Sequence, residues 1–380
     1  MIFLSACSTE THAASYDWKS DWAVADGFLL ERDVGGLQFP TTIAFVPDPG
    51  TEPNDPLYFV TELKGKVLAV TNDRSIFTFA ENFFELQPKA ELPDFEGEVG
   101  LAGICLEPEY GYVFVTFAYH DVNGVLRNNI VRFQSTPYTF STEPTAQIAF
   151  TEIFSGDESS PSHQIGPCQT VDDSLYVGVG DGEKASKSRQ LGSTLGKILR
   201  MSFDGNPIET NPFYDGADSE NPANYVWAYG LRNPFGLKAV GARIFVADNG
   251  RKIDRFLEIE QGADYLWDGD EVSNGVNADA VFSPGFGVAQ LNRYPEESLL
   301  FPEQFRQSFF LAVTGNTQVT ELEESRKQPP RILTFEYGIE QSRLLSVPTP
   351  IIRYRGDGIQ MIVGADFGPD GLYFVPLFPD

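Results

Sequence analysis

A short apolar strand recurs six times along this 380-residue chain. The copies are Leu57–Val60, Tyr112–Val115, Leu175–Gly178, Ile244–Ala247, Phe309–Ala312 and Leu372–Val375. Successive copies start 55 to 69 residues apart, and most lie between an acidic or glycine-containing turn and a further strand. This interval is longer than a solenoid repeat and fits a four-stranded propeller blade. The recurrence therefore predicts an all-β fold, a six-bladed β-propeller.

The composition agrees with many short strands. The chain has 35 Gly and 26 Pro for tight turns, and 31 Phe and 15 Tyr that favour strands. No linker divides it, so we expect residues 27–380 to form a single domain. The strand-like segment Gly27–Arg32 is expected to complete the last blade, because a propeller must hide its strand edges.

The net charge narrows the range of partners. The chain carries 54 acidic and 27 basic residues, a formal charge of −27, so its average surface repels phosphate backbones and anionic lipid headgroups. Nucleic acid is therefore excluded as a partner, and the acidity is interpreted as a solubility feature. No apolar run of about 18 residues exists, and we expect no transmembrane segment.

The N-terminal region resembles an export signal. Leu4-Ser-Ala-Cys7 is similar to the lipobox of bacterial lipoproteins, and a small, polar stretch follows it. No basic region precedes it, which leaves either a truncated signal or a chance match. Residues 1–26 are thus predicted to be a leader or tether, with a lipid anchor at Cys7. The expected location is periplasmic or on the outer surface.

Two further cysteines, Cys105 and Cys168, lie in strand-like segments. They are either buried free thiols or, if the compartment is oxidising, partners in a disulfide.

One polar loop is the best candidate for chemistry. Ser160–Gly166 carries His163, one of three histidines, and leads into the apolar strand Ser174–Val179. Loops at strand entrances are where a rigid scaffold presents functional groups. Imidazole can act as a base near neutral pH, so His163 is a candidate catalytic base. The alternative is a histidine that merely caps its loop.

The motif in this loop is one of a series that is spread over most of the chain. In order, they are Gly97-Glu98-Val-Gly100-Leu-Ala-Gly103, Ser162-His163-Gln164-Ile-Gly166, Gly180-Asp181-Gly182, Leu195-Gly-Lys-Ile-Leu-Arg200, Tyr229-Gly-Leu-Arg-Asn-Pro234 and Gly262-Ala-Asp-Tyr-Leu-Trp267. From about Gly36 onward the chain resembles the soluble sugar dehydrogenases that use pyrroloquinoline quinone (PQQ), the glucose/sorbosone dehydrogenase family.

The resemblance implies a six-bladed propeller with PQQ on its top face, over the central channel. It implies that His163 takes the proton of a sugar's anomeric hydroxyl while hydride passes to the quinone, and that an external acceptor then reoxidises the cofactor. Arg232 and Asn233 match the pair that contacts the quinone, and Glu98 matches a polar group facing it. The plainer interpretations are an Arg232 paired with an acid and a Glu98 exposed in a turn.

The resemblance also implies a Ca²⁺ ion that bridges the quinone and two main-chain carbonyls. The matching positions are Gly250 and Arg251, and oxygen ligands suit this hard cation. Asp248 and Asp254 are either supporting acids or ordinary turn residues.

Three departures from the family pattern stand out. Ser162 replaces the acidic residue that precedes the histidine, and Arg255-Phe256 replaces an acidic pair. The third concerns cations: Asn316 stands where the family has lysine, and Met361–Val363 aligns with the family's arginines. PQQ carries three carboxylates that need such charges. Arg353 and Arg355 are alternative sources of that charge.

Three functions follow from these observations. The first is a PQQ-dependent oxidation of an aldose to its lactone. The second is a propeller that has lost the cofactor and acts as a binding or interaction module, which the missing cations favour. The third is a metal-dependent lactonase, which would need several acidic or amide ligands converging on the channel.

Overall fold

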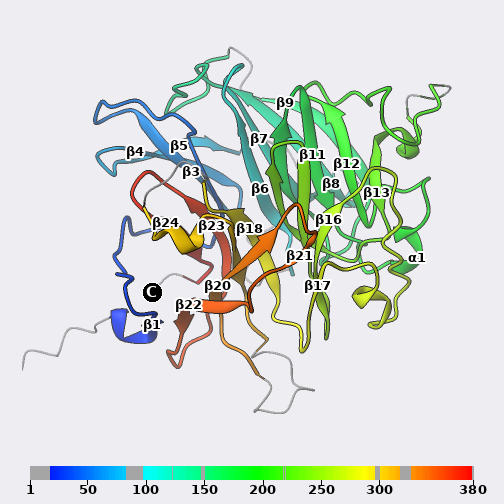
Figure 1. The fold of residues 1–380 in the computed structure, drawn as a ribbon. Helices are drawn as coiled ribbons and strands as arrows, with labels where there is room; N and C mark the ends of the chain where they lie inside the picture. Colours follow the sequence, from blue (N-terminus) through cyan, green and yellow to red (C-terminus); the bar gives the residue numbers. More distant parts are fainter. Residues whose placement is uncertain are drawn as a thin grey trace, which may run out of the picture.

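The computed structural model describes residues 18–82, 97–121, 123–146, 150–216, 218, 220–295, 300–316 and 327–378 (Figure 1). The cysteine predicted to carry a lipid, Cys7, lies outside them. Four sheets have four antiparallel strands each. They are β2 (Pro40–Phe45), β3 (Pro56–Glu62), β4 (Lys66–Thr71) and β5 (Ile76–Glu81); β6 (Gly100–Glu107), β7 (Tyr112–His120), β8 (Leu126–Gln134) and β9 (Thr151–Glu158); β10 (Ile165–Val171), β11 (Ser174–Val179), β12 (Lys197–Ser202) and β13 (Val226–Tyr229); and β14 (Pro234–Val240), β15 (Arg243–Asp248), β16 (Asp254–Ile259) and β17 (Ala280–Phe282).

A fifth sheet is larger and a sixth is smaller. The fifth contains β18 (Val288–Arg293), β19 (Ser308–Val313), β20 (Arg331–Gly338), β22 (Thr349–Tyr354) and β1 (Trp22–Val24), with β21 (Arg343–Leu344) beside β20. The sixth contains only β23 (Ile362–Phe367) and β24 (Leu372–Pro376). The described helices are single turns, such as α1 (Ala185–Ser188), η1 (Trp18–Asp21) and η2 (Pro222–Tyr225). The prediction of an all-β propeller is confirmed.

The recurring apolar strand of the sequence is the second strand of each sheet, namely β3, β7, β11, β15, β19 and β24. The strand before each of them is innermost. These inner strands, β2, β6, β10, β14, β18 and β23, pack each against the next and close a ring around the channel. The repeat in the sequence therefore marks positions around this ring correctly.

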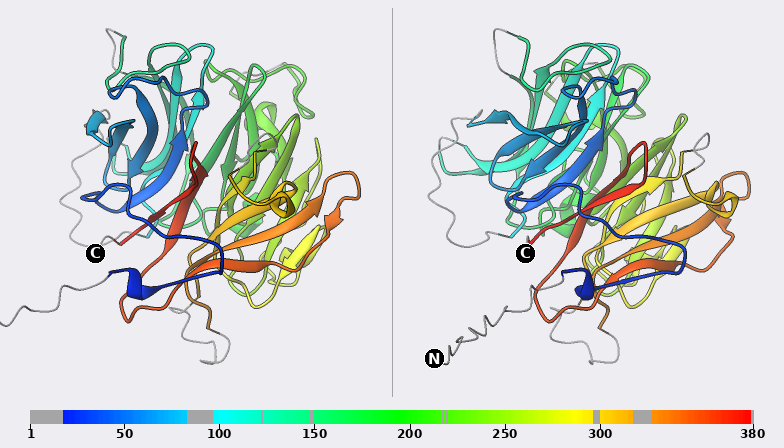
Figure 2. Two further views of the ribbon diagram at one scale, coloured as in Figure 1. Left: turned by 60° about the vertical axis from the view of Figure 1, so that its left-hand side comes forward. Right: turned by 90° about the vertical axis from the view of Figure 1, so that its left-hand side faces the viewer.

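The predicted number of blades is wrong. Five sheets are blades of at least four strands, whereas β23 and β24 form a two-stranded sheet between β18 and β2. Gly27–Arg32 forms no strand and does not extend this sheet. Instead β1 pairs with β22 at the outer edge of the fifth blade, as Figure 2 shows for the dark blue N-terminal segment beside the orange-red strands. The side chains of Phe28 and Leu30 pack against the neighbouring apolar cluster, and the Phe28 amide donates to the Ala25 carbonyl within a turn.

Each inner strand carries a bulge near its start, because its register against the second strand shifts there in all six sheets. The strands approach one another closely at these points. A Cβ atom on Gly103 would lie 2.1 Å from the carbonyl oxygen of Gly166, and one on Gly236 would lie 2.3 Å from that of Ala289. Glycine is therefore required where neighbouring blades meet.

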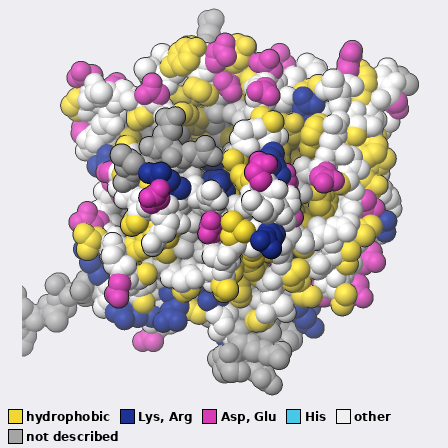
Figure 3. All heavy atoms as spheres, viewed as in Figure 1, with side chains coloured by type: hydrophobic (Ala, Val, Ile, Leu, Met, Phe, Trp, Pro, Cys, Tyr) yellow, Lys and Arg dark blue, Asp and Glu magenta, His cyan; other side chains and the backbone are white. Residues whose placement is uncertain are grey.

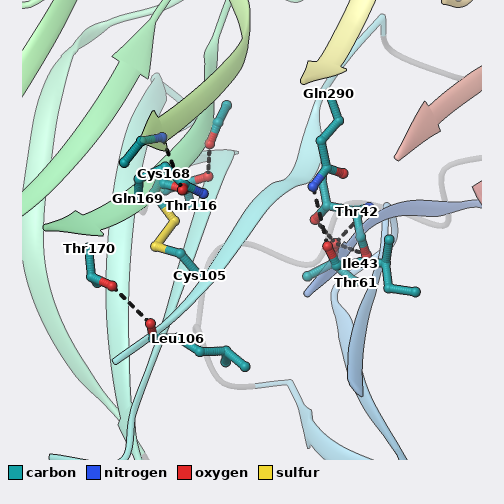
Figure 4. The surroundings of a disulfide bond; sticks show 12 residues. Thr42, Ile43, Thr61, Cys105, Leu106, Thr116, Cys168, Gln169, Thr170 and Gln290 are labelled. Atoms are coloured by element: carbon teal, nitrogen blue, oxygen red, sulfur yellow. Dashed lines mark hydrogen bonds between the residues drawn. A yellow bond between two sulfur atoms is a disulfide. The ribbon is translucent and has the colours of Figure 1, made fainter. Parts of the chain in front are cut away.

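A disulfide joins the inner strands of the second and third blades (Figure 4). Cys105 on β6 and Cys168 on β10 have Cα atoms 5.7 Å apart, and both residues are buried. Beside the bridge, the Thr170 hydroxyl donates to the Leu106 carbonyl at 2.9 Å. Of the two alternatives that the sequence left open, the structure contains the disulfide.

Acidic side chains are spread over the face shown in Figure 3, among lysines and arginines. Within the described residues, no helix has the length and apolar character needed to cross a membrane.

Candidate functional site

A cavity of about 420 Å³ opens at one end of the central channel. Two sets of loops line it: those that lead into the inner strands and those that follow the second strands. Both sets reach the same face because these two strands are antiparallel neighbours in every sheet. The six residues that the sequence singled out, Glu98, His163, Arg232, Asn233, Gly250 and Arg251, all line this cavity.

The backbone of His163 is held in a strained conformation. Its φ is +56°, in the left-handed region that costs a non-glycine residue about 1–3 kcal/mol. Its amide donates to Glu98 Oε2 at 2.8 Å, and its carbonyl accepts from the Gly182 amide at 3.0 Å. A Cβ atom on Gly180 would lie 2.3 Å from the same carbonyl oxygen. These contacts fix the direction of the imidazole ring.

A buried carboxylate orients that ring. His163 Nδ1 lies 2.6 Å from Oδ1 of Asp181, whose side chain is 2% exposed. With its proton on Nδ1, the neutral ring keeps Nε2 free to accept a proton. The family resemblance places an acidic residue directly before the histidine to orient it, and Ser162 stands at that position here. Asp181, in the Gly180–Gly182 turn, supplies the orienting acid instead; the sequence motif alone does not indicate this role.

Glu98 forms part of the cavity wall and is half-buried. Burial raises the pKa of its carboxyl, while the hydrogen bond from the His163 amide and the charge of Arg232 act in the opposite direction. Its structural role is to receive the His163 amide. Glu98 is therefore not a freely exposed turn residue.

Arg232 and Asn233 are positioned through their backbones. Their amides donate to the two carboxylate oxygens of Asp248, at 3.2 and 2.7 Å. The Arg232 guanidinium donates to the Asn249 carbonyl at 2.6 Å. The countercharge of Asp248 is Arg255, at 2.9 Å, and both side chains are fully buried. Arg255, which breaks the family's acidic pattern, thus neutralises the acid that holds the Arg232 loop.

The loop that carries Gly250 and Arg251 depends on a second buried acid. Asp254 accepts the Gly250 amide at 2.8 Å and the Gly287 amide at 3.0 Å. Burial raises the pKa of Asp254 to about 6. Asp248 and Asp254 thus bind main-chain amides. No group of three or more His, Cys, Asp or Glu within the described ranges is arranged to hold a metal ion.

Comparison with known proteins agrees with this geometry. A family model described as glucose/sorbosone dehydrogenase matches residues 37–298, more than half of the chain. The chain belongs to the glucose/sorbosone dehydrogenase family. The suspected family is thereby confirmed.

Individual relatives are distant. Quinoprotein glucose dehydrogenase B of Acinetobacter calcoaceticus is 21% identical over 248 residues, which cover 57% of this chain and 48% of the relative. The chain spans about half the length of the curated relatives it matches.

Solved structures show the same fold. A crystal structure of a glucose dehydrogenase aligns with a TM-score of 0.70 at 19% identity, covering 92% of this chain and 96% of the other. The PQQ-bound aldose sugar dehydrogenase of Streptomyces coelicolor aligns with a TM-score of 0.66 at 22% identity, covering 93% and 91%.

The far wall of the cavity departs from the family pattern. It contains Asn316, Met361 and Val363. The Asn316 carboxamide is already used, because it donates to the Gly285 carbonyl at 2.7 Å and accepts the Gln328 amide at 2.5 Å. This side chain supports a loop and offers no charge.

The two arginines proposed as substitutes do not reach the cavity. Arg353 lies on β22 and pairs in register with Ala23 of β1, and the guanidinium of Arg355 donates to the Ser20 carbonyl. The expectation that they replace the family's cations is therefore wrong. Among the described residues that line the cavity, the cationic side chains are Arg232 and Arg251.

The donor set nevertheless fits an anionic ligand held from one side. A guanidinium, a buried carboxamide and an oriented imidazole share one cavity, at Arg232, Asn233 and His163. Guanidinium groups are well suited to carboxylates and to oxygens that gain negative charge. The residues present can therefore hold PQQ by its contacts with this side.

Proposed function

We propose that this family member is a PQQ-dependent dehydrogenase that oxidises an aldose at its anomeric carbon to the lactone. The observation that carries the proposal is the oriented pair of His163 and Asp181, 2.6 Å apart, in the same cavity as Arg232. A histidine that only capped its loop would not need a buried carboxylate on Nδ1.

The residues of the chain define the proton transfer. His163 Nε2 takes the proton of the anomeric hydroxyl as the C–H bond at that carbon breaks and its electron pair leaves as hydride. Asp181 stabilises the imidazolium that results, since its carboxylate accepts a hydrogen bond from Nδ1–H and carries the opposite charge. Arg232 stabilises negative charge that develops on the acceptor side. Bound PQQ would supply the two-electron acceptor for the hydride.

Gly250 and Arg251 are our proposed Ca²⁺ site. Their loop lines the cavity, and Asp254 fixes it through the Gly250 amide, which leaves main-chain carbonyls as ligands. Carbonyl oxygens suit Ca²⁺. The cation would also offset part of the negative charge of the cofactor.

We also propose that the protein is exported, to the periplasm or the outer surface, with a lipid anchor at Cys7. The disulfide between Cys105 and Cys168 supports this proposal, because such bonds persist in oxidising compartments. An external electron acceptor would complete the catalytic cycle there.

The alternative is a propeller of the same family that binds a ligand without the quinone. The uncharged wall at Asn316, Met361 and Val363 favours it, because carboxylates facing that wall would lose solvation without gaining a cation.

The test is dye-linked oxidation over a panel of aldoses, with protein reconstituted with PQQ and Ca²⁺. Substitution His163→Ala should lower kcat by about 10²–10⁴-fold, the usual contribution of a general base. His120→Ala is the matched control, because His120 does not line the cavity and its imidazole Nδ1 contacts the Gly124 carbonyl at an exposed turn. Equal activity of His163→Ala and wild type would refute the assignment of the base. If none of the aldoses in the panel is oxidised, the alternative is favoured.

A further inference from the structure

Trp267 contacts the second oxygen of the carboxylate that orients His163. Its indole Nε1–H donates to Asp181 Oδ2 at 2.7 Å, while Oδ1 of the same carboxylate faces His163. Trp267 is 4% exposed and Asp181 is 2% exposed. The carboxylate is thus held at both oxygens, and a rotation about its terminal bond would break both contacts.

The same indole ring touches the other half of the site. The Arg232 guanidinium carbon lies 5.7 Å from the centroid of the Trp267 ring, within the range of a cation–π contact. The backbones are connected as well, because the Asp181 amide donates to the Arg232 carbonyl at 2.7 Å. Trp267 therefore lies between the acid behind the base and the arginine.

The backbone of Trp267 is fixed on both sides. Its amide donates to the Gly230 carbonyl at 2.9 Å, and its carbonyl accepts from the Ser188 hydroxyl at 2.8 Å. Ser188 belongs to α1, and its own carbonyl accepts the Gly230 amide. The indole thus projects from a rigid support, as a residue that positions others must.

We propose that Trp267 is a positioning residue that aligns His163, through Asp181, with Arg232 in one active site. The inference rests on the proposed function and extends it to a residue outside the cavity lining. The indole donor occupies Oδ2, while Oδ1 accepts the Glu183 amide at 2.9 Å and faces the imidazole. The carboxylate held in this way fixes the tautomer of His163 and the direction of Nε2. The ring face limits the guanidinium to one side of the cavity.

The plainer alternative is that Trp267 only fills the core. A second tryptophan, Trp227, serves as a control that distinguishes the two interpretations. Trp227 is half-buried and also lies under an arginine, with the Arg200 guanidinium carbon 5.1 Å from its ring centroid. Its buried indole N–H has no hydrogen-bond partner in the described structure. Like Trp267 it has an arginine over its ring, but it lacks the hydrogen bond to a carboxylate.

The first experiment needs no cofactor. The chain has only four tryptophans and three histidines, so selective ¹⁵N labelling gives few signals to assign. In the apoprotein, Asp181→Asn should move the Trp267 indole N–H resonance upfield, because an amide oxygen is a weaker acceptor than a carboxylate. His163→Ala should move it too, through the shared carboxylate. The Trp227 resonance should stay in place in both variants.

The second experiment uses the reconstituted enzyme. Trp267→Phe keeps a ring beside Arg232 but removes the N–H donor, and we expect kcat to fall about tenfold with KM changed less than about twofold. Trp227→Phe should leave both constants within about twofold. Thermal unfolding of each variant verifies that it is folded.

Two outcomes overturn the inference. One is a Trp267 resonance that does not move in Asp181→Asn or His163→Ala. The other is a folded Trp267→Phe enzyme with wild-type kcat. If the resonance moves but neither the wild-type protein nor any variant oxidises a sugar, the link between Trp267 and His163 stands and the proposed function fails.

Discussion

The two walls of the cavity are built in different ways. On one wall, buried acids fix each functional group: Asp181 holds His163, and Asp248 holds the amides of Arg232 and Asn233. On the other wall, the Asn316 carboxamide hydrogen-bonds two backbone groups, and Met361 and Val363 are uncharged. The first wall therefore has the polar and charged groups of an active site, while the second offers a ligand mainly uncharged contacts.

This difference shows which features tolerate change. The inner-strand bulges recur in all six described sheets, including the two-stranded one, whose bulge contains Val363 of the second wall. We expect a cation at Met361 to act mainly on the ligand, because the hydrogen bonds of Met361 are made by its backbone. Loss of a buried acid on the first wall would disturb both folding and binding.

The largest effect should come from the acid that anchors the first wall. Asp248→Ala leaves Arg255 fully buried without its countercharge, which should cost about 3–5 kcal/mol of the free energy of unfolding. Denaturant unfolding measures this loss. Glu81→Gln is the control, because it removes an exposed ion pair with Lys66 and should cost less than about 1 kcal/mol. A loss below about 1 kcal/mol for Asp248→Ala would contradict the role of this pair.

A smaller effect, in the opposite direction, should follow from charging the second wall. Met361→Arg places a cation where carboxylates of PQQ would face the cavity, and should tighten PQQ binding about tenfold, or about 1.4 kcal/mol. Ile359→Arg adds the same charge at a side chain that is 61% exposed and lies outside the cavity, and should change the affinity little. Equal effects of the two substitutions would show that only overall charge matters.

The sequence predicted the ring of strands because their spacing is regular and their apolar residues are buried. It did not predict the number of complete blades, since outer strands such as β5 are partly exposed and lack that signature. The spacing of the cysteines does indicate the disulfide: Cys105 and Cys168 are 63 residues apart, the same interval as between Tyr112 and Leu175, so they occupy equivalent positions in neighbouring blades.

The candidate site was predictable where a single loop carries the group, as for His163 and Arg232. The partner of His163 was not, because Asp181 belongs to the next strand connection and approaches only after β10 and β11 pair. The same limit applies to Trp267, 86 residues from Asp181. Contacts between loops of different blades follow from topology, which local patterns do not specify.

The central claim is that the wall with Arg232 binds PQQ, and calorimetric titration of PQQ into the apoprotein with Ca²⁺ tests it most directly. We expect tight binding that depends on Ca²⁺ and weakens about tenfold to a hundredfold in Arg232→Ala, the range for a lost hydrogen bond to a charged group. Arg200→Ala, on the ring of Trp227, should bind like wild type. No binding to the folded protein, or equal binding by Arg232→Ala, would contradict the account.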